Sequence, residues 1–394
     1  MTARALDQRP TTKAHNMLEV LLFGSIFLVF FSYFGYPLTL VAVGWMRGRD
    51  ISRAEIYPTV TIIITVLNEE TRVREKLDNT LALDYPRDKL QILVASDGST
   101  DCTNEIVRGY RVRGVELLEM RDRKGKEYAQ KEAIKSATGD ILVFSDVATS
   151  MEPGGLRQLV SSFADPTVGC VSSEDRLIGR DGKPSGEGLY VRYEMWLRSL
   201  ESRAGSLVGL SGSLFAARKE VCSNFSGEMQ SDFRTVLNSV KAGLRGISDP
   251  LALGIYRDTT DQKREWNRKI RTIVRGLTVF FRHTELLNVF RYGMFSYQLF
   301  SHKLLRWLVP FFMIGAFGAN MALLDSNTLT YLFLFAAQFL FYGLGILGIV
   351  KPKVQKLILV KIPVYFIAVN ASIFVAWGRY LSGQRIVTWT PTRR

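Results

Sequence analysis

The chain has 394 residues, of which 47% are hydrophobic, and a formal net charge of +14. This charge does not by itself predict nucleic-acid binding, because the basic clusters lack aromatic stacking platforms and no recognition motif accompanies them. The three cysteines and three histidines lie far apart without metal-ligand spacing, which argues against a zinc site and a disulfide framework. An excess of Lys and Arg is instead typical of cytoplasmic segments beside membrane spans.

The first predicted element is a membrane-spanning helix. After an N-terminal arm at 1–16, residues 17–46 form one long hydrophobic segment, and about 20 apolar residues suffice to cross a bilayer. The segment lacks a small-residue cleavage site after a short apolar stretch, so we expect a retained anchor rather than a signal peptide. A short polar linker follows at 47–57.

Residues 58–260 are predicted to form one α/β domain. Their apolar, β-branched runs are typical of parallel strands covered on both faces, and a charged, helix-compatible stretch between the first two gives a βαβ unit. The predicted strands are 59–66, 90–95, 140–144 and 168–172, with a helix at about 69–82. Ligands bind beyond the carboxyl ends of the strands in such sheets, which predicts a pocket at that edge.

Polar residues gather at the carboxyl ends of three of these strands. They are Asn68, Glu69 and Glu70, then Asp97 and Asp101, then Asp146. Acidic side chains there can accept hydrogen bonds from a base or ribose, or hold a divalent cation that bridges phosphates. The alternative for each residue alone is a turn former or helix cap, but three groups at one sheet edge favour a binding pocket.

Two further residues are less evident candidates. Lys126 follows Gly125, which lets the backbone bend close to a ligand, and its ammonium can meet a phosphate as a point charge. A solvated basic loop is the alternative. Asp232 follows Ser231, and this pattern alone predicts no more than a helix cap.

The C-terminal part is predicted to lie on and in a membrane. Residues 261–303 interleave cations with apolar side chains, which is typical of helices along a membrane surface, although a solvated helical linker is an alternative. Three further hydrophobic segments at about 304–324, 329–350 and 358–378 predict three transmembrane helices within 304–380. A basic tail follows at 381–394.

The ordered motifs resemble those of family 2 glycosyltransferases. They are Val66-Leu67-Asn68-Glu69-Glu70, Asp97-Gly98-Ser99-Thr100-Asp101, Arg123-Lys124-Gly125-Lys126, Phe144-Ser145-Asp146, Ser211-Gly212-Ser213 and Ser231-Asp232-Phe233. Within that family the chain is similar to the membrane-embedded group that includes hyaluronan, chitin-oligosaccharide and poly-N-acetylglucosamine synthases. The resemblance covers about residues 58–280. It implies a GT-A fold, which is Rossmann-like, a nucleotide-sugar donor, a divalent cation and inversion at the anomeric carbon.

The resemblance also implies a role for individual residues. Asp97 would recognise the uracil, and Asn68 and Glu69 would line the nucleotide pocket. Lys126 would lie near the donor, and Asp146 would match the first acid of the DxD motif and hold Mg²⁺ or Mn²⁺. Asp232 would be the general base. Displacement at the anomeric carbon needs such a base for the acceptor hydroxyl. It also needs cationic stabilisation of the leaving diphosphate.

Two positions depart from the family pattern. The second DxD acid is replaced by Ala148, which leaves Asp146, diphosphate oxygens and water to complete a metal site. Thr272 stands where processive members have the tryptophan of an arginine-containing motif, if Arg268 and Arg271 are its cations. An alternative registration starts at Gln262 and ends at Trp266. We expect Arg268 and Arg271 to contact the diphosphate and Trp266 to line the acceptor path, together with Ser211 and Gly212; contact with lipid headgroups is the alternative for the cations.

The expected activity is therefore transfer of a hexose or N-acetylhexosamine from a UDP-sugar to a growing polysaccharide or lipid-linked glycan. The expected location is the inner (plasma) membrane, with several spans, a cytoplasmic catalytic domain, and lipids and exopolysaccharide assembly proteins as partners, but no nucleic acid. One alternative is a polyprenyl-phosphate glycosyltransferase that makes a sugar-phosphate lipid. Another is a non-catalytic membrane assembly subunit.

The predicted topology contains a conflict. A cytoplasmic domain after one span and before three spans places the basic tail 381–394 outside, against the positive-inside tendency. The cations Lys351, Lys353 and Lys356 agree with that tendency. Either the tail crosses as counted, or a segment near 280–300 or 358–378 does not span simply.

Overall fold

A computed structural model describes residues 12–178, 189–257, 262–326 and 328–386. The chain divides into two compact units. The helical unit contains the chain up to Leu38 and Phe300–Ser382, and the sheet unit contains Thr39–Leu299 with the residues from Gly383 onward.

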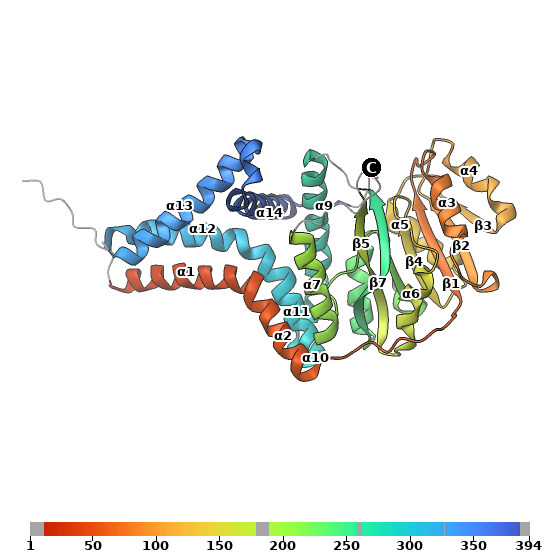
Figure 1. Ribbon diagram of the computed structural model, residues 1–394, viewed down its shortest axis with the longest axis horizontal. Coiled ribbons are helices and arrows are strands. Elements are labelled where there is room, and N and C mark those ends of the chain that lie inside the picture. Colours follow the sequence, from red (N-terminus) through yellow and green to blue (C-terminus); the bar gives the residue numbers. More distant parts are fainter. Residues whose placement is uncertain (1–11, 179–188, 258–261, 327, 387–394) are drawn as a thin grey trace, which may run out of the picture. The chain divides into compact units, whose positions relative to one another are not determined.

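The sheet unit is built on a seven-stranded sheet of order β3-β2-β1-β4-β6-β5-β7 (Figure 1). The strands are β1 Val60–Val66, β2 Leu90–Ser96, β3 Val115–Glu119, β4 Ile141–Asp146, β5 Val168–Ile178, β6 Leu214–Arg218 and β7 Arg245–Arg257. Strands β1 to β4 pair in parallel, β6 is antiparallel to both β4 and β5, and β7 is parallel to β5. The predicted α/β fold with a mostly parallel sheet is confirmed.

Strand β1 is an interior strand of this sheet, and all seven of its residues are buried. Ile62 and Ile64 belong to a hydrophobic core with residues of α3 and α6, whereas Ile63 points to the opposite face. Helix α5 contacts β1 and β2. In register, Val66 pairs with Ser96 of β2 and Thr65 with Asp146 of β4, so the carboxyl ends of these three strands meet at one edge.

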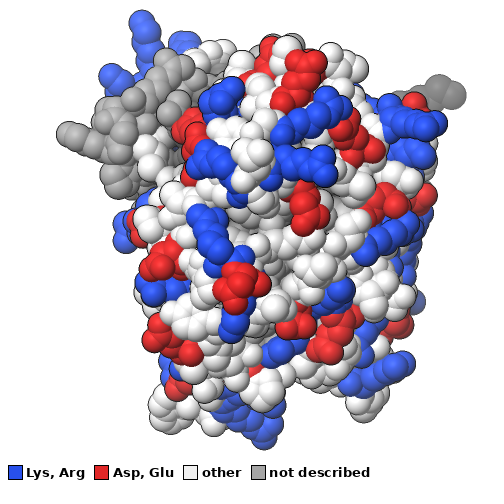
Figure 2. All heavy atoms as spheres, turned by 90° about the vertical axis from the view of Figure 1, so that its right-hand side faces the viewer, with Lys and Arg blue, Asp and Glu red and all other residues white. Residues whose placement is uncertain are grey.

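Helices connect the strands of this unit and extend beyond the last one. They are α3 Val73–Leu81, α4 Thr103–Gly109, α5 Lys126–Ser136, α6 Gly155–Ser161, α7 Leu189–Ala204, α8 Ser231–Lys241, α9 Gln262–Phe281, α10 Val289–Tyr292 and α11 Met294–Leu299. Figure 2 shows basic and acidic side chains interleaved over the visible face of the unit.

The helical unit contains the long apolar helices. They are α1 Thr12–Phe30, α12 Arg306–Leu323, α13 Leu329–Val350 and α14 Ile358–Leu381, with α2 Tyr36–Arg47 continuing α1 through a π-helical turn at Phe31–Gly35 and a second such turn at Phe300–Leu305 leading into α12. In the described part of the whole chain, four continuous stretches are long and apolar enough to cross a membrane: Thr12–Arg47, Met294–Leu323, Leu329–Val350 and Ile358–Leu381.

Within this unit α14 differs in direction from the other long helices. Figure 1 shows α14 nearly end-on, whereas α1 and α12 lie along the page. Its residue Trp377 donates from the indole nitrogen to the carbonyl oxygen of Trp307 at 2.8 Å, which fixes α14 against α12.

Candidate active site

The loops that follow β1 and β2 are bonded to each other. The Asn68 backbone N–H donates to Ser99 Oγ at 3.1 Å, and Asn68 Oδ1 accepts from the Thr100 N–H at 2.8 Å. The Glu70 N–H donates to Asp101 Oδ2 at 3.1 Å. Asn68 has a φ of 52°, in the left-handed region that asparagine tolerates better than most residues. Asn68, Glu70 and Asp101 therefore hold the two loops together.

Asp97 holds a third loop in place. Its side chain is completely buried, and its carboxylate accepts from the N–H groups of Lys124 at 2.7 Å and Gly125 at 2.9 Å. Gly125 has a φ of 109°, which a side chain would strain, and α5 begins at the next residue. Through these bonds Asp97 fixes where Lys126 enters the site.

A cleft of about 280 Å³ opens at this edge of the sheet. Seven of the predicted site residues line it: Glu69, Lys126, Asp146, Gly212, Asp232, Arg268 and Arg271. Among the residues that the structure describes, four predicted ones are not on its lining: Asn68, Asp97, Ser211 and Trp266.

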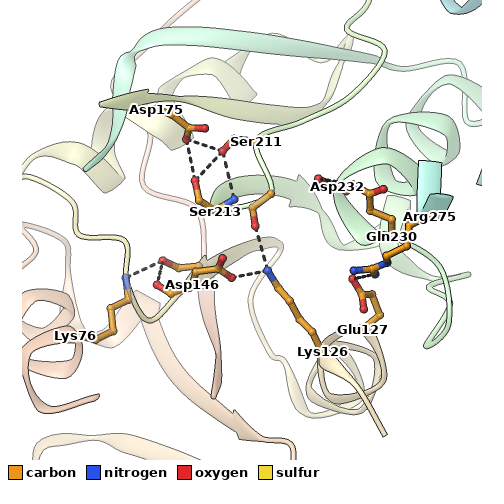
Figure 3. Close-up of polar contacts among 12 residues, drawn as sticks. Lys76, Lys126, Glu127, Asp146, Asp175, Ser211, Ser213, Gln230, Asp232 and Arg275 are labelled. Atoms are coloured by element: carbon orange, nitrogen blue, oxygen red, sulfur yellow. Dashed lines mark hydrogen bonds and ion pairs between the residues drawn. The ribbon is translucent and has the colours of Figure 1, made fainter. Parts of the chain in front are cut away.

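One side of the cleft carries a lysine paired with the strand-end acid. Lys126 Nζ forms an ion pair with Asp146 and donates to the carbonyl oxygen of Gly212 at 3.1 Å (Figure 3). Nearby, the buried Glu69 accepts two bonds from Arg72, at 2.8 and 2.7 Å. Burial raises the pKa of Glu69, and Arg72 acts against that rise.

A buried lysine supports the turn that carries Asp146. Lys76 on α3 is 2% exposed and donates to Ser145 Oγ at 2.7 Å and to the Thr149 carbonyl at 2.5 Å. Burial lowers the pKa of Lys76 to about 7. The pattern of helix 69–82 gave no sign of this contact, because Lys76 reads as one more charged helix residue.

The other side of the cleft carries Asp232, in the first turn of α8. One of its oxygens accepts from the Phe233 N–H at 2.8 Å and the other from Gln230 Nε2 at 3.1 Å. Desolvation raises the pKa of Asp232. A Cβ at Gly212 would lie 2.9 Å from Asp232 Oδ2, so only glycine leaves this side chain in place. Gly212 thus lies between Asp232 and Lys126, and the Lys126 ammonium donates to the Gly212 carbonyl oxygen.

A further acidic residue at the cleft was not predicted from the sequence. Asp175 on β5 accepts from Ser211 Oγ at 2.6 Å and Ser213 Oγ at 2.8 Å, and both Asp175 and Ser213 line the cleft. The available signal was the polar run that follows the apolar part of this strand.

Helix α9 turns one face to the cleft. Arg268, Arg271, Thr272 and Arg275 all line it, at the i, i+3, i+4 and i+7 spacing of a single helix face. Arg268 is paired with Glu265 at 2.8 Å, and Arg275 forms an ion pair with Glu127. Arg275 could have been found from its helical spacing to Arg268 and Arg271. Glu127 had no signal beyond its place next to Lys126.

A divalent cation fits this site only with ligands that a substrate would bring. Among the described residues, no group of three His, Cys, Asp or Glu side chains is placed to hold a metal ion. Asp146 lines the cleft with Ala148 two residues on, so one carboxylate is available there. One carboxylate completed by phosphate oxygens and water is a coordination that Mg²⁺ accepts.

Comparisons with known proteins concern the domain and the fold. The family model "Glycosyl transferase family 2" matches residues 61–224. Poly-beta-1,6-N-acetyl-D-glucosamine synthase of Staphylococcus aureus is 26% identical over 159 residues, which are 39% of this chain and 37% of that protein. Beta-monoglucosyldiacylglycerol synthase of Synechocystis sp. is 30% identical over 119 residues, 29% of this chain and 25% of that protein. The matches thus span 37% and 25% of the lengths of these two curated relatives.

A solved structure is similar over nearly the whole chain. The mannosyltransferase PcManGT from Pyrobaculum calidifontis, in complex with GDP-Man and Mn²⁺, superposes with a TM-score of 0.72 at 24% identity, covering 93% of this chain and 99% of that one. At this identity the likeness concerns the fold. Residues 61–224 are therefore similar to the family 2 glycosyltransferase domain, the fold is GT-A-like, and the described residues include four candidate membrane helices.

Proposed function

We propose that the protein is an inverting glycosyltransferase that moves a sugar from a nucleotide-sugar, a UDP-sugar in particular, to a glycan or lipid-linked acceptor at a membrane. The observation that carries the proposal is the meeting of Lys126, Asp146 and Asp232 on one cleft around Gly212. The names of the two curated relatives, a polysaccharide synthase and a glycolipid synthase, support a membrane-associated product.

The two sides of the cleft support different tasks. Lys126 and the arginines Arg268 and Arg271 would face the donor diphosphate, where fixed cations compensate the charge that develops on the leaving group. Asp146 would hold Mg²⁺ or Mn²⁺, which when bound adds Lewis-acid stabilisation of that diphosphate.

Asp232 would take the proton of the acceptor hydroxyl. Its position across Gly212 from Lys126 supports this role, because a base must approach from the side opposite the leaving group. Desolvation raises the pKa of Asp232, which makes its carboxylate a stronger base, and the nearby cations Arg275 and Lys126 oppose that rise. Trp266 and Ser211, beside the lining, would border the acceptor path.

On the nucleotide side we propose Asn68, Glu69 and Asp97. Glu69 lines the cleft, and the other two form its supporting loops. A cytoplasmic location for the sheet unit follows from the proposed donor, since nucleotide-sugars are made in the cytoplasm. The candidate membrane helices support an inner-membrane location.

Incubation of the purified chain with a panel of nucleotide-sugars tests the proposal. We expect hydrolysis or transfer from at least one UDP-sugar with Mg²⁺ or Mn²⁺, and its loss in Asp146→Asn and Asp232→Asn. No turnover of any donor would favour a non-catalytic assembly subunit. Chromatography of labelled product separates a polymer from a small lipid-soluble species, and the latter would favour a polyprenyl-phosphate or other lipid acceptor.

A further inference from the structure

A buried ion pair beside Asp232 has no part in the proposed chemistry so far. Glu127 is the second residue of α5, directly after Lys126, and Arg275 lies on α9. Arg275 Nη2 donates to Glu127 Oε1, and the two side chains are 10% and 3% exposed. Figure 3 shows this pair next to Gln230 and Asp232.

The pair is poorly satisfied for a buried one. Glu127 Oε2 and Arg275 Nε are both buried without a hydrogen-bond partner among the described residues. An unsatisfied buried polar atom destabilises the fold, and more so when the group is charged. A buried ion pair with such atoms is a poor source of stability.

Another buried pair of the same unit makes the contrast clear. Arg245 and Asp165 are equally buried, at 8% and 10% exposure. There Arg245 also donates to Thr167 Oγ1 at 3.0 Å and to the carbonyl of Asp50 at 3.3 Å, and Thr167 bonds to Asp165 as well. That pair shows how the fold satisfies ions when they hold it together. Glu127 and Arg275 are arranged differently.

What the Glu127–Arg275 pair does is place charge near Asp232. The charged groups that act on Asp232 are Lys126 from α5 and Arg275 from α9, and Glu127 and Arg271 line the same cleft. Arg275 and Lys126 favour the ionised carboxylate against its desolvation. The Glu127 carboxylate pairs with the Arg275 guanidinium and partly cancels its positive charge.

We propose that Arg275 and Glu127 are positioning residues that set the charge around Asp232: Arg275 stabilises the carboxylate, and Glu127 limits how far it does so. This inference rests on the proposed function, in which Asp232 is the base. A base held too strongly as a carboxylate is a weak proton acceptor, and one held too weakly is protonated at working pH, so a balanced pair suits the step.

Two substitutions separate this role from a merely structural one, because they move the system in opposite directions. Arg275→Met removes the stabilising charge, so the acid limb of the kcat–pH profile moves up by about one pH unit. Glu127→Gln keeps an oxygen for Arg275 but leaves the guanidinium charge uncancelled, so the acid limb moves down. Arg275→Lys restores the charge and returns the limb toward its wild-type position.

The controls lie on the same helix and in the same site. Glu132→Gln removes one charge from the exposed Glu132–Lys135 pair of α5, and the profile stays in place. Asp232→Asn in the same panel reports on the proposed function itself.

Each outcome decides between the two claims. Acid limbs that stay in place in Arg275→Met and Glu127→Gln, or that move in the same direction, overturn the inference while an inactive Asp232→Asn leaves the proposed function standing. If Arg275→Met does not fold, Glu127→Gln and Arg275→Lys carry the same decision. Full activity in Asp232→Asn, or a wild type that turns over no donor, overturns the proposed function and this inference with it.

Discussion

The two walls of the cleft are built in different ways. On the β1–β2 side, Asn68, Asp97 and Asp101 use backbone N–H groups as partners, so their polar atoms are consumed by loop structure. On the α8–α9 side, Asp232 is bonded to its chain neighbours Gln230 and Phe233, but the cations that act on it, Lys126 and Arg275, come from other elements. The comparison teaches that the most conspicuous polar residues can be scaffold, while the proposed base owes its charged surroundings to tertiary contacts.

The largest effect is expected at the base on the α8–α9 side. Asp232→Asn removes the proposed proton acceptor, and loss of a general base costs on the order of 10³-fold in kcat. The apparent melting temperature should change little, because the amide can still accept from the Phe233 N–H. The matched control is Asp88→Asn, at an exposed position. An Asp232→Asn enzyme with a kcat within a few-fold of the wild-type value would contradict the proposed role of Asp232 as the base on the α8–α9 side.

Gly212 tests whether the two walls are coupled by close packing. In Gly212→Ala the new Cβ would lie 2.9 Å from Asp232 Oδ2, and that flexible side chain end must move away. We expect a fall in kcat on the order of 10²-fold, the cost of a displaced catalytic group, with little loss of stability.

The control for this substitution is Gly109→Ala, because a Cβ at Gly109 meets no atom within 4 Å. If Gly212→Ala unfolds the protein while Gly109→Ala does not, the glycine serves the fold and not the placement of Asp232.

A substitution at Asp97 tests whether the polar residues of the β1–β2 side serve to hold the loops in place. Asp97→Asn places an amide where both carboxylate oxygens accept from the Gly125 N–H, so buried bonds are lost or opposed. We expect a loss of about 1–3 kcal/mol in unfolding free energy together with lower activity. Differential scanning fluorimetry and donor KM should be measured together. A higher donor KM at unchanged stability would instead support direct contact with the nucleotide base.

The sequence predicted the central strands because their burial on both faces leaves an uninterrupted apolar run, as in β1. It did not reveal β7, since Pro250 and a register shift interrupt that strand's pattern. In the site, Glu69 and Asp146 could be predicted from the sequence because they stand at the ends of such apolar runs. The pairing of Glu127 with Arg275 could not be predicted, because 148 residues separate them and only the folded chain brings them together.

The smallest effect is expected at Lys76, which supports the Asp146 turn from below. Burial lowers its pKa from 10.5 to about 7, so between about pH 7 and 10.5 the unfolded chain binds a proton there that the folded chain lacks. Stability from this group therefore rises with pH across that window. Lys76→Met removes the rise, so the melting temperature of the wild type relative to Lys76→Met should increase from pH 7 to pH 10. Lys135→Met, at an exposed position of α5, should keep the wild-type slope. Parallel curves for the wild type and Lys76→Met would mean that Lys76 stays protonated in the fold, and that the turn below Asp146 carries a permanent charge.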